Sequence, residues 1–348
     1  MSLKLDLPPT FTPVEVGAIE DDLAARWHTA TRDGAAPAAH SSTLNLIVCV
    51  EDAAAAGEVS KVVDRLAATH PIRSLTIVSD ELADDRRVAA WLGAGCAPAP
   101  AAQICSEEIT LLVNPDALEL NVSTVEGLLA GDLPAYFYWR GAAPTGDPLF
   151  AGLARLADKV IVDSVRFGDG PAALDTVRRL LNHRSYRFGV ADLNWERTAP
   201  WREAVAACFD DPSVLALLPS LDRASVDFAG GSSPAQRPSA RALLVAGWLA
   251  SREARLRNRI RVRATALQEL GSGRVVQVSL SSSQTMAQLA LERRSSPTGI
   301  GATARDASGH TIRMWSFPAS TLGEAELIHR CIDAPARDPL LEAALHHE

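Results

Sequence analysis

The alternation of apolar runs with helix-like stretches in the first half of this sequence restricts its fold more than any other feature. Continuous apolar, β-branched runs such as TLNLIVCV at residues 43–50 are typical of strands that are buried on both faces. Strands that are separated by helices need right-handed crossovers, which make them parallel and place helices over the sheet. The predicted strands are residues 43–50, 72–80, 107–114, 133–140 and 159–164.

We therefore predict an α/β fold. Its N-terminal domain, residues 1–190, is a mostly parallel Rossmann-like sheet with helices on both faces, and residues 1–40 form an N-terminal helix and a loop. Within this domain, residues 84–93 (DDRRVAAWLG) are predicted as a helix. The stretch 93–100 (GAGCAPAP), which is rich in Gly and Pro, is predicted as a loop.

The pattern changes near residue 190, and residues 191–348 are predicted to form a C-terminal α+β domain. Helices are expected at residues 191–212, which form one helix or two short ones, at 237–255 and in the last segments of the chain. Between them, short segments with period-2 alternation are separated by turn signals such as GSG and DASGH, which predicts antiparallel hairpins. These segments are residues 274–282, 286–294, 299–307 and 311–318.

Composition and charge restrict the classes of partner. The 348 residues are 47% hydrophobic, enough for a sizeable core, and their formal net charge is -8. An acidic chain is a poor match for phosphate backbones and anionic lipids, so we expect no nucleic-acid and no membrane partner. The chain has no run of about 18 apolar residues and its start lacks the apolar core of a signal peptide, which predicts a cytoplasmic protein.

The usual signatures of catalytic and cofactor sites are missing. The five cysteines are sparse and lack CxxC spacing, so neither a disulfide framework nor a zinc site is expected. Cys96 and Cys105 would form a redox pair only if their Cβ atoms approach and align. Glycine-rich nucleotide motifs and a G-x-S-x-G elbow do not occur, and no histidine has a recognisable partner in the sequence. We expect no cofactor, no metal and no catalytic residue.

Polar residues follow the predicted strand at residues 159–164. Asp163, Ser164 and Arg166 suit a small-molecule pocket for a phosphate or a sugar, because ligands of such sheets bind beyond the carboxyl ends of the strands. The same residue types also cap helices and fold loops back on themselves, so the simpler structural interpretation stays open beside the functional one.

Aromatic residues next to arginines form the second group of candidates. Trp139 and Arg140 end an aromatic strand, and Asp147 suits the N-cap of a helix that begins at Pro148. Trp and Arg are the usual anchors of protein interfaces, although packing between domains would explain them as well. The candidate partner-binding residues are Trp139, Arg140, Asp147, Phe150, Trp195, Arg197, Trp201 and Arg202.

Several stretches together resemble the OpcA family, the glucose-6-phosphate dehydrogenase assembly proteins of cyanobacteria and actinobacteria. The most specific block is LPAYFYWRGAAPTGDPLF, followed by KVIVDSVRF. Trp139, Arg140 and Gly141 stand where the family tends to have Trp, Pro and Gly. DLNWERTAPWREAVAACFD and the tail AELIHRCIDAPARDPLLEAAL carry the resemblance further, and residues 256–320 are less clearly similar.

The resemblance implies a non-catalytic protein that binds glucose-6-phosphate dehydrogenase, promotes its active oligomer and raises its activity in the oxidative pentose phosphate pathway. Thiol control of activation is known in cyanobacterial members; no cysteine of this chain is matched to a regulatory one, and redox control stays open here. The alternatives are an enzyme that binds a sugar phosphate or a nucleotide at the strand ends, and a metabolite sensor that uses the same pocket without catalysis.

Overall fold

Two compact units make up the chain, and each is built from several segments. The first comprises Met1–Asp163, His183–Ala191 and Gly323–Arg337, and the second comprises Ser164–Asn182, Asp192–Leu322 and Asp338–Glu348. Where the sequence analysis places one boundary near residue 190, the chain passes between the units near residues 163, 182, 191, 322 and 337. The computed structural model describes residues 7–32, 42–67, 69–98, 103–183, 187–230, 237–266, 271–295 and 298–347.

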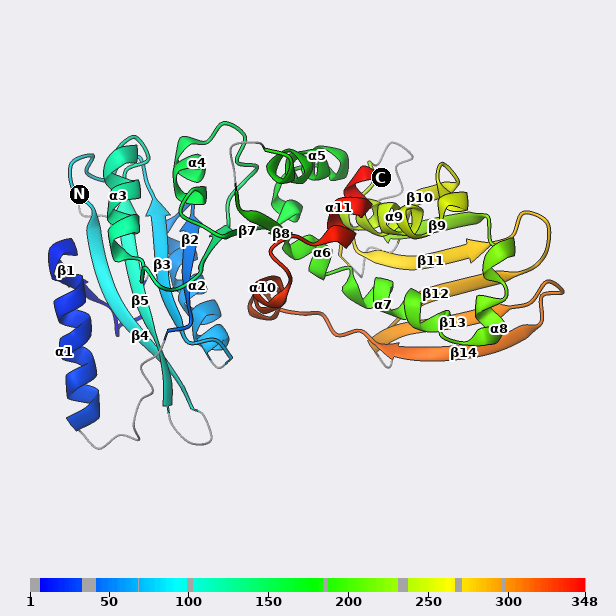
Figure 1. Ribbon diagram of the computed structural model, residues 1–348, viewed down its shortest axis with the longest axis horizontal. Coiled ribbons are helices and arrows are strands. Elements are labelled where there is room, and N and C mark those ends of the chain that lie inside the picture. The colour runs from blue at the N-terminus through cyan, green and yellow to red at the C-terminus, as the bar shows by residue number, and fades with distance from the viewer. Residues whose placement is uncertain are drawn as a thin grey trace. The chain divides into compact units, whose positions relative to one another are not determined.

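An eight-stranded sheet forms the centre of the first unit, with the strand order β1-β4-β5-β3-β2-β6-β7-β8 (Figure 1). Strands β5, β3, β2, β6 and β7 pair in parallel, which confirms the predicted Rossmann-like arrangement. Every residue of β2 is buried, so this part of the sheet is covered on both faces. The strands are β1 (Thr12–Val14), β2 (Leu44–Val50), β3 (Ile72–Ser79), β4 (Ala89–Pro98), β5 (Gln103–Val113), β6 (Ala135–Trp139), β7 (Lys159–Val162) and β8 (Gly189–Asp192).

The prediction of a helix at residues 84–93 and of a loop at 93–100 is wrong, because Ala89–Pro98 form strand β4, which pairs antiparallel with β5. Ala90 and Leu92 are buried at alternate positions, and this period-2 pattern is too short to outweigh helix-forming residues in the sequence. A Cβ atom at Gly93 would lie 2.5 Å from the ring of Phe11, so a larger residue here would displace that ring. The register places Cys96 opposite Cys105 along the backbone.

Helices of the first unit pack in two groups. Helix α2 lies against strands β2 to β5 and is itself covered by α10, whereas α3 packs on α4 and α4 packs on β6. Asp147 caps α4 as predicted: its carboxylate accepts a hydrogen bond from the backbone N–H of Phe150 at 2.8 Å, and Pro148 occupies the first turn. The helices are α1 (Ile19–Arg32), α2 (Ala53–Ala67), α3 (Leu118–Leu128), α4 (Pro148–Ala154) and α10 (Glu324–Asp333).

Helix α10 belongs to the first unit although it lies close to the C-terminal end of the sequence. The buried ammonium of Lys159 donates hydrogen bonds to the backbone carbonyls of Cys331 at 2.7 Å and of Ala334 at 2.6 Å, at the end of this helix. Burial of an ammonium group is costly unless such acceptors surround it, so Lys159 helps to fix where α10 ends. Gly189 lies so close to the backbone of Ala336 that no Cβ atom fits.

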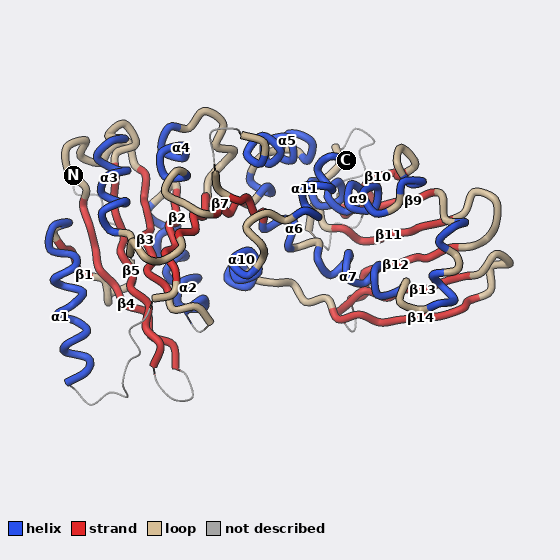
Figure 2. The backbone as a smooth tube through the Cα atoms, viewed as in Figure 1, coloured by secondary structure: helices blue, strands red, loops and turns tan. Residues whose placement is uncertain are grey.

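A six-stranded sheet forms the second unit, with the order β10-β9-β11-β12-β13-β14 (Figure 2). Strands β11 to β14 are antiparallel neighbours, which confirms the predicted hairpins. Strands β9 and β10 were not predicted from the sequence, and they pair in parallel at one edge of the sheet. The strands are β9 (Arg223–Ala229), β10 (Ile260–Thr265), β11 (Val275–Ser281), β12 (Gln288–Ser295), β13 (Thr298–Arg305) and β14 (Thr311–Pro318).

Helix α9 is the central helix of the second unit and packs on β9, β10, α5, α6, α7 and α11. It is buried over most of its surface, and it begins where the hydroxyl of Ser239 accepts a hydrogen bond from the N–H of Ala242. Helix α7 lies against β13 and β14. The helices are α5 (Gly170–Leu181), α6 (Leu193–Glu196), α7 (Ala199–Cys208), α8 (Pro212–Leu215), α9 (Ala240–Arg252) and α11 (Pro339–His346). Among the described residues, no helix is long and apolar enough to cross a membrane.

The buried carboxyl group of Glu108 on β5 leads to a prediction about how the stability of the protein depends on pH. Burial raises its pKa from 4.5 to about 7, the nearby Asp64 adds to the rise, and a hydrogen bond with Ser60 opposes it. Because the folded state holds this proton more tightly than the unfolded chain does, the group lowers stability as pH rises from about 4.5 to about 7. Glu108→Gln should therefore stabilise the protein at pH 8 by about 2–3 kcal/mol and change little at pH 5.

Urea unfolding at the two pH values measures this difference. Glu126→Gln, on the exposed side of α3, is the control and should show no such dependence. Equal shifts for Glu108→Gln at pH 5 and pH 8 would contradict the assignment of the raised pKa to Glu108.

Candidate functional site

The aromatic residues predicted at the end of strand β6 are part of the core of the first unit. Trp139 is 7% exposed and Phe150 is 2% exposed, and their rings meet edge to face with centroids 5.4 Å apart. The indole N–H of Trp139 donates to the carbonyl of Ala142 at 2.7 Å. These two buried side chains therefore support the loop that follows β6. They expose too little surface to contact another protein directly.

Arg140 follows β6 and is held between two carboxylates. Its guanidinium donates to Glu324 at 2.8 Å and to Glu58 at 2.7 Å, and the hydroxyl of Tyr138 donates to the same Glu324 at 2.7 Å. Burial by itself lowers the pKa of Arg140, but the hydrogen bond and charge of Glu324 outweigh burial and raise it. The pKa of Tyr138 is raised, first by burial and then by the charge of Glu324.

The loop between β6 and α4, residues 141–147, is anchored at both ends, and we refer to it as the anchored loop. Glu51 accepts a hydrogen bond from the N–H of Ala142 at 2.8 Å, and Asp147 caps α4 at the other end. Gly141 leaves no room for a side chain between Glu51 and Trp139, and Gly146 has a φ of 76°, which favours glycine. Between these anchors, Thr145 and Gly146 are exposed.

The three polar residues after β7 lie in different surroundings. Asp163 and Ser164 are 5% and 0% exposed, whereas Arg166 is exposed. The hydroxyl of Ser164 donates to Asp192 at 2.6 Å, and Asp192 also caps α6 by accepting from the N–H of Asn194. A hollow beside Ser164 is lined by Asn194, Arg237 and Arg241 among others, but not by Asp163 or Arg166. The predicted trio therefore does not converge on one pocket.

Trp195 and Arg202 stack on each other in the second unit. The guanidinium carbon of Arg202 lies 3.4 Å from the ring centre of Trp195, a cation–π contact. The indole N–H of Trp195 donates to Asp338, the N-cap of α11, at 2.7 Å. Trp195 is 2% exposed, so this pair joins α6, α7 and α11 inside the unit rather than forming an outer contact surface.

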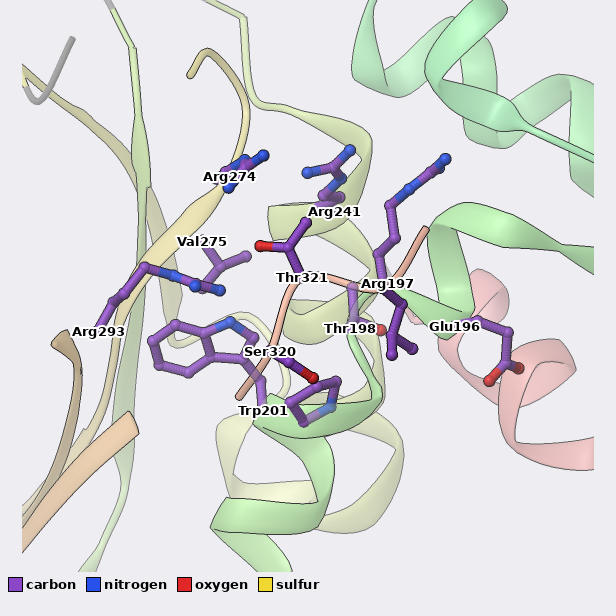
Figure 3. A pocket seen from close by; sticks show the side chains of 12 residues that line it. Glu196, Arg197, Thr198, Trp201, Arg241, Arg274, Val275, Arg293, Ser320 and Thr321 are labelled. Carbon is purple, nitrogen blue, oxygen red and sulfur yellow. The ribbon is translucent and has the colours of Figure 1, made fainter. Parts of the chain in front are cut away.

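Arg197 and Trp201 line a small pocket together with arginines that the sequence analysis did not single out. Figure 3 shows Arg293 of β12 and Arg274, just before β11, on one side of it, and Arg241 of α9 and Arg197, just after α6, on the other. We call this the arginine pocket. Its remaining walls are Glu196, Thr198, Pro200, Trp201, Val275, Ser320, Thr321 and Leu322.

The arginine pocket carries an excess of positive charge. Arg293 lies over the indole of Trp201, 5.9 Å from its centre, and its pKa is lowered by burial and then by the charge of Arg274. Glu196 is the one acidic residue among the described residues that line the pocket. The arginines are far apart in the sequence and come from four places: Arg197 follows α6, Arg241 lies on α9, Arg274 precedes β11 and Arg293 lies on β12.

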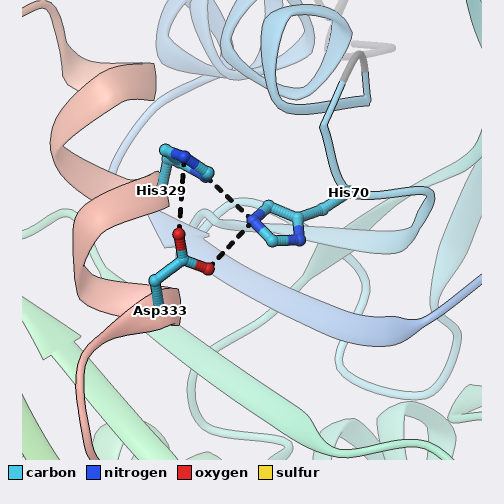
Figure 4. A group of neighbouring side chains, drawn as sticks. All are labelled: His70, His329 and Asp333. Carbon is cyan, nitrogen blue, oxygen red and sulfur yellow. Dashed lines mark hydrogen bonds and ion pairs between the residues drawn. The ribbon is translucent and has the colours of Figure 1, made fainter.

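Two histidines and an aspartate meet in the first unit and could hold a metal ion (Figure 4). Nε2 of His70, in the loop before β3, lies 2.8 Å from Nδ1 of His329 and 3.4 Å from the carboxylate of Asp333. His329 and Asp333 are one turn apart on α10, with 3.4 Å between Nε2 and the carboxylate. Sequence spacing could have suggested the second pair, but not its meeting with His70.

Two family profiles match consecutive parts of this chain. Both describe a glucose-6-phosphate dehydrogenase subunit: the profile of its N-terminal domain matches residues 63–179, and the profile of its C-terminal domain matches residues 188–345. A protein of a Synechocystis strain named OxPP cycle protein OpcA is 35% identical over 198 residues, which is 56% of this chain and 40% of that protein. Its counterpart in Nostoc punctiforme is 34% identical over 55% of this chain and 40% of its own length.

The aligned part thus spans less than half the length of these relatives. Among solved structures, a 3-ketoreductase from Actinomadura kijaniata matches with a TM-score of 0.44 and 9% identity, covering 88% of this chain and 95% of its own. An oxidoreductase from Bacillus cereus matches with a TM-score of 0.45 and 11% identity, over 87% and 94% of the two chains. We draw nothing about chemistry from likenesses this distant.

The ion pair of Arg140 with Glu324 gives a prediction for this site. Glu324→Gln should destabilise the protein by about 1.5–3 kcal/mol, because the largely buried guanidinium of Arg140 and the hydroxyl of Tyr138 both lose a charged acceptor. Glu58→Gln removes the other, more exposed partner and should cost less than about 1 kcal/mol. Denaturant unfolding of both variants measures the two costs, and equal costs would show that Glu324 does not hold Arg140 and Tyr138 in place.

Proposed function

Because this chain belongs to the OpcA family of glucose-6-phosphate dehydrogenase assembly proteins, we propose that it binds a glucose-6-phosphate dehydrogenase and raises the activity of that enzyme. The family matches, which extend over residues 63–179 and 188–345, are the observation that carries the proposal. The relatives are named OxPP cycle proteins, and we extend to this chain a role at the entry to the oxidative pentose phosphate pathway, where NADPH is formed in the cytoplasm.

An activator of this kind works only through a difference in affinity. It shifts its partner toward the active oligomer if it binds that oligomer more tightly than the inactive form. In our proposal the chain is a non-catalytic ligand of the enzyme. Polar groups at three of the candidate positions support this role, because Arg140 and Asp147 in the first unit and Ser164 in the second already bind other parts of their own unit.

We propose the anchored loop, residues 141–147, as a contact surface for the dehydrogenase. A loop with a fixed conformation loses little conformational entropy on binding, and both ends of this loop are held by hydrogen bonds and by buried aromatic rings. In this proposal Trp139 and Phe150 act by supporting the loop, and the exposed residues near Thr145 make the contact.

Mixing the purified protein with glucose-6-phosphate dehydrogenase from the same organism tests the activity. We expect a stable complex by light scattering, and a fall of roughly 5- to 150-fold in the glucose 6-phosphate concentration that half-saturates NADPH formation. The same assay is run once with a thiol reductant and once under oxidising conditions. If neither a complex nor a change in rate appears under either condition, the proposed function is wrong.

Thr145→Arg tests the contact surface separately. The exposed substitution should leave the melting temperature unchanged and weaken the complex at least tenfold, because a long charged side chain would separate the loop from its partner. Ser123→Arg, at an exposed position of α3 in the same unit, is the matched control and should bind normally. Full affinity of Thr145→Arg would exclude the anchored loop while leaving the activator function intact.

A further inference from the structure

Arg274 and Arg293 lie together in the arginine pocket without an ion-pair partner among the described residues. The charge of Arg274 is near enough to lower the pKa of Arg293, so the two guanidinium groups repel each other. Within the described part of the chain, the buried Nε of Arg293 also finds no hydrogen-bond acceptor. A buried donor without an acceptor is costly, and native structures rarely keep one without a ligand or a function for it.

The other walls of the pocket add groups that suit an oxyanion. Ser320 and Thr321 bring hydroxyl groups from the segment that follows β14, and Figure 3 shows Arg293 beside the indole of Trp201. A guanidinium presents two parallel N–H donors that match two oxygens of one phosphate group. Converging arginines with hydroxyls beside them are therefore the chemistry of a phosphate site.

We propose that the arginine pocket binds the dianionic phosphate group of a small molecule, either inorganic phosphate or the ester phosphate of a metabolite. The ligand gives Arg293 its missing acceptor and removes the repulsion between Arg274 and Arg293. This site belongs to the second unit alone, and it does not depend on the proposed binding of a dehydrogenase.

Thermal unfolding of the free protein in increasing inorganic phosphate, against sodium chloride at equal ionic strength, tests the site. A ligand that binds only the folded state raises the melting temperature by mass action, so phosphate should raise it progressively and chloride should not. Arg274→Gln should abolish the response to phosphate. It should also melt no lower than the unchanged protein in chloride alone, because it relieves the repulsion.

Two further variants keep the result interpretable. Arg293→Lys retains the charge but loses the two-pronged donor, and it should weaken phosphate binding about tenfold. Arg261→Gln makes the same charge change at an exposed position of the edge strand β10 and should respond to phosphate like the unchanged protein. A full phosphate response in Arg274→Gln would refute the site, and so would the absence of any response in the unchanged protein.

Calorimetry with inorganic phosphate and with glucose 6-phosphate then distinguishes free phosphate from the phosphate group of a metabolite as the ligand. Tighter binding of the ester by tenfold or more identifies a phosphorylated metabolite, and equal affinities identify free phosphate; either result supports the site. If neither binds while Arg274→Gln weakens a complex with the dehydrogenase, the pocket receives an acidic side chain of that protein and our proposal is overturned.

A second, independent observation is the cluster of His70, His329 and Asp333 in the first unit (Figure 4). One ligand atom from each side chain lies within 4.8 Å of the others. Two imidazoles and one carboxylate, with one position left for water, form a donor set that zinc accepts. Each side chain is at least partly accessible, so an ion has a path to the cluster.

We infer that this cluster binds Zn²⁺. The two histidines are 259 positions apart in the sequence, so a shared ion would clip α10 to the loop before β3. Zinc bonds of about 2.0–2.1 Å in a tetrahedral site separate two nitrogens by roughly 3.3 Å. The present separation of 2.8 Å between Nε2 of His70 and Nδ1 of His329 would therefore open by about half an ångström, and the ion would replace their hydrogen bond.

Titration of the metal-free protein with ZnCl₂ and with MgCl₂ measures the site by calorimetry. We expect His329→Ala to bind one equivalent of zinc fewer than the unchanged protein, and magnesium to bind neither. His310→Ala, at an exposed histidine of the second unit, is the control and should lose nothing. The double variant His346→Ala/His347→Ala, which changes two histidines of the second unit that are adjacent in the sequence, is a further control and should also lose nothing. An unchanged zinc stoichiometry in His329→Ala would refute this inference.

Discussion

The placement of helix α10 on the first unit depends on largely buried charges that bind both of its ends. Glu324, in the first turn of the helix, accepts hydrogen bonds from Arg140 and Tyr138 at the end of β6. At the other end of the helix, Lys159 on β7 donates to its last carbonyls. Charges that are largely buried need such partners, so neither strand end is satisfied unless the helix lies in this position. The anchored loop starts directly after Arg140, so its position also depends on the ion pair between Arg140 and Glu324.

Predictions from the sequence succeed where one local signal dominates. The parallel strands are continuous apolar runs, and the Asp147–Pro148 pair specifies a helix start, so both are confirmed by the structure. Strand β4 was predicted as a helix because its Ala, Trp and Leu residues also form helices, and the pairing with β5 that decides the matter is not a local property. Strands β9 and β10 were missed for a related reason, since parallel pairing at one edge follows from tertiary structure.

The candidate sites show the same limit more strongly. Trp139, Trp195 and Trp201 were predicted as contact residues from their type, and all three are buried, where indoles more often contribute to a core. Arg274 precedes β11 and Arg293 lies on β12, and His70 and His329 are 259 positions apart, so no short sequence motif predicts either cluster. What sequence did provide was the family resemblance, which needs only the order of residues and no knowledge of contacts.

The interleaving of the two units has a consequence for the order of events during synthesis. The first unit contains residues 323–337, so the ribosome must have made the whole of the second sheet before the first unit can close. Until then the ammonium of Lys159 and the guanidinium of Arg140 lack the carbonyl and carboxylate acceptors of α10. Nascent chains therefore expose an unfinished sheet, and removal of residues 323–348 would disturb the first unit as well as the second.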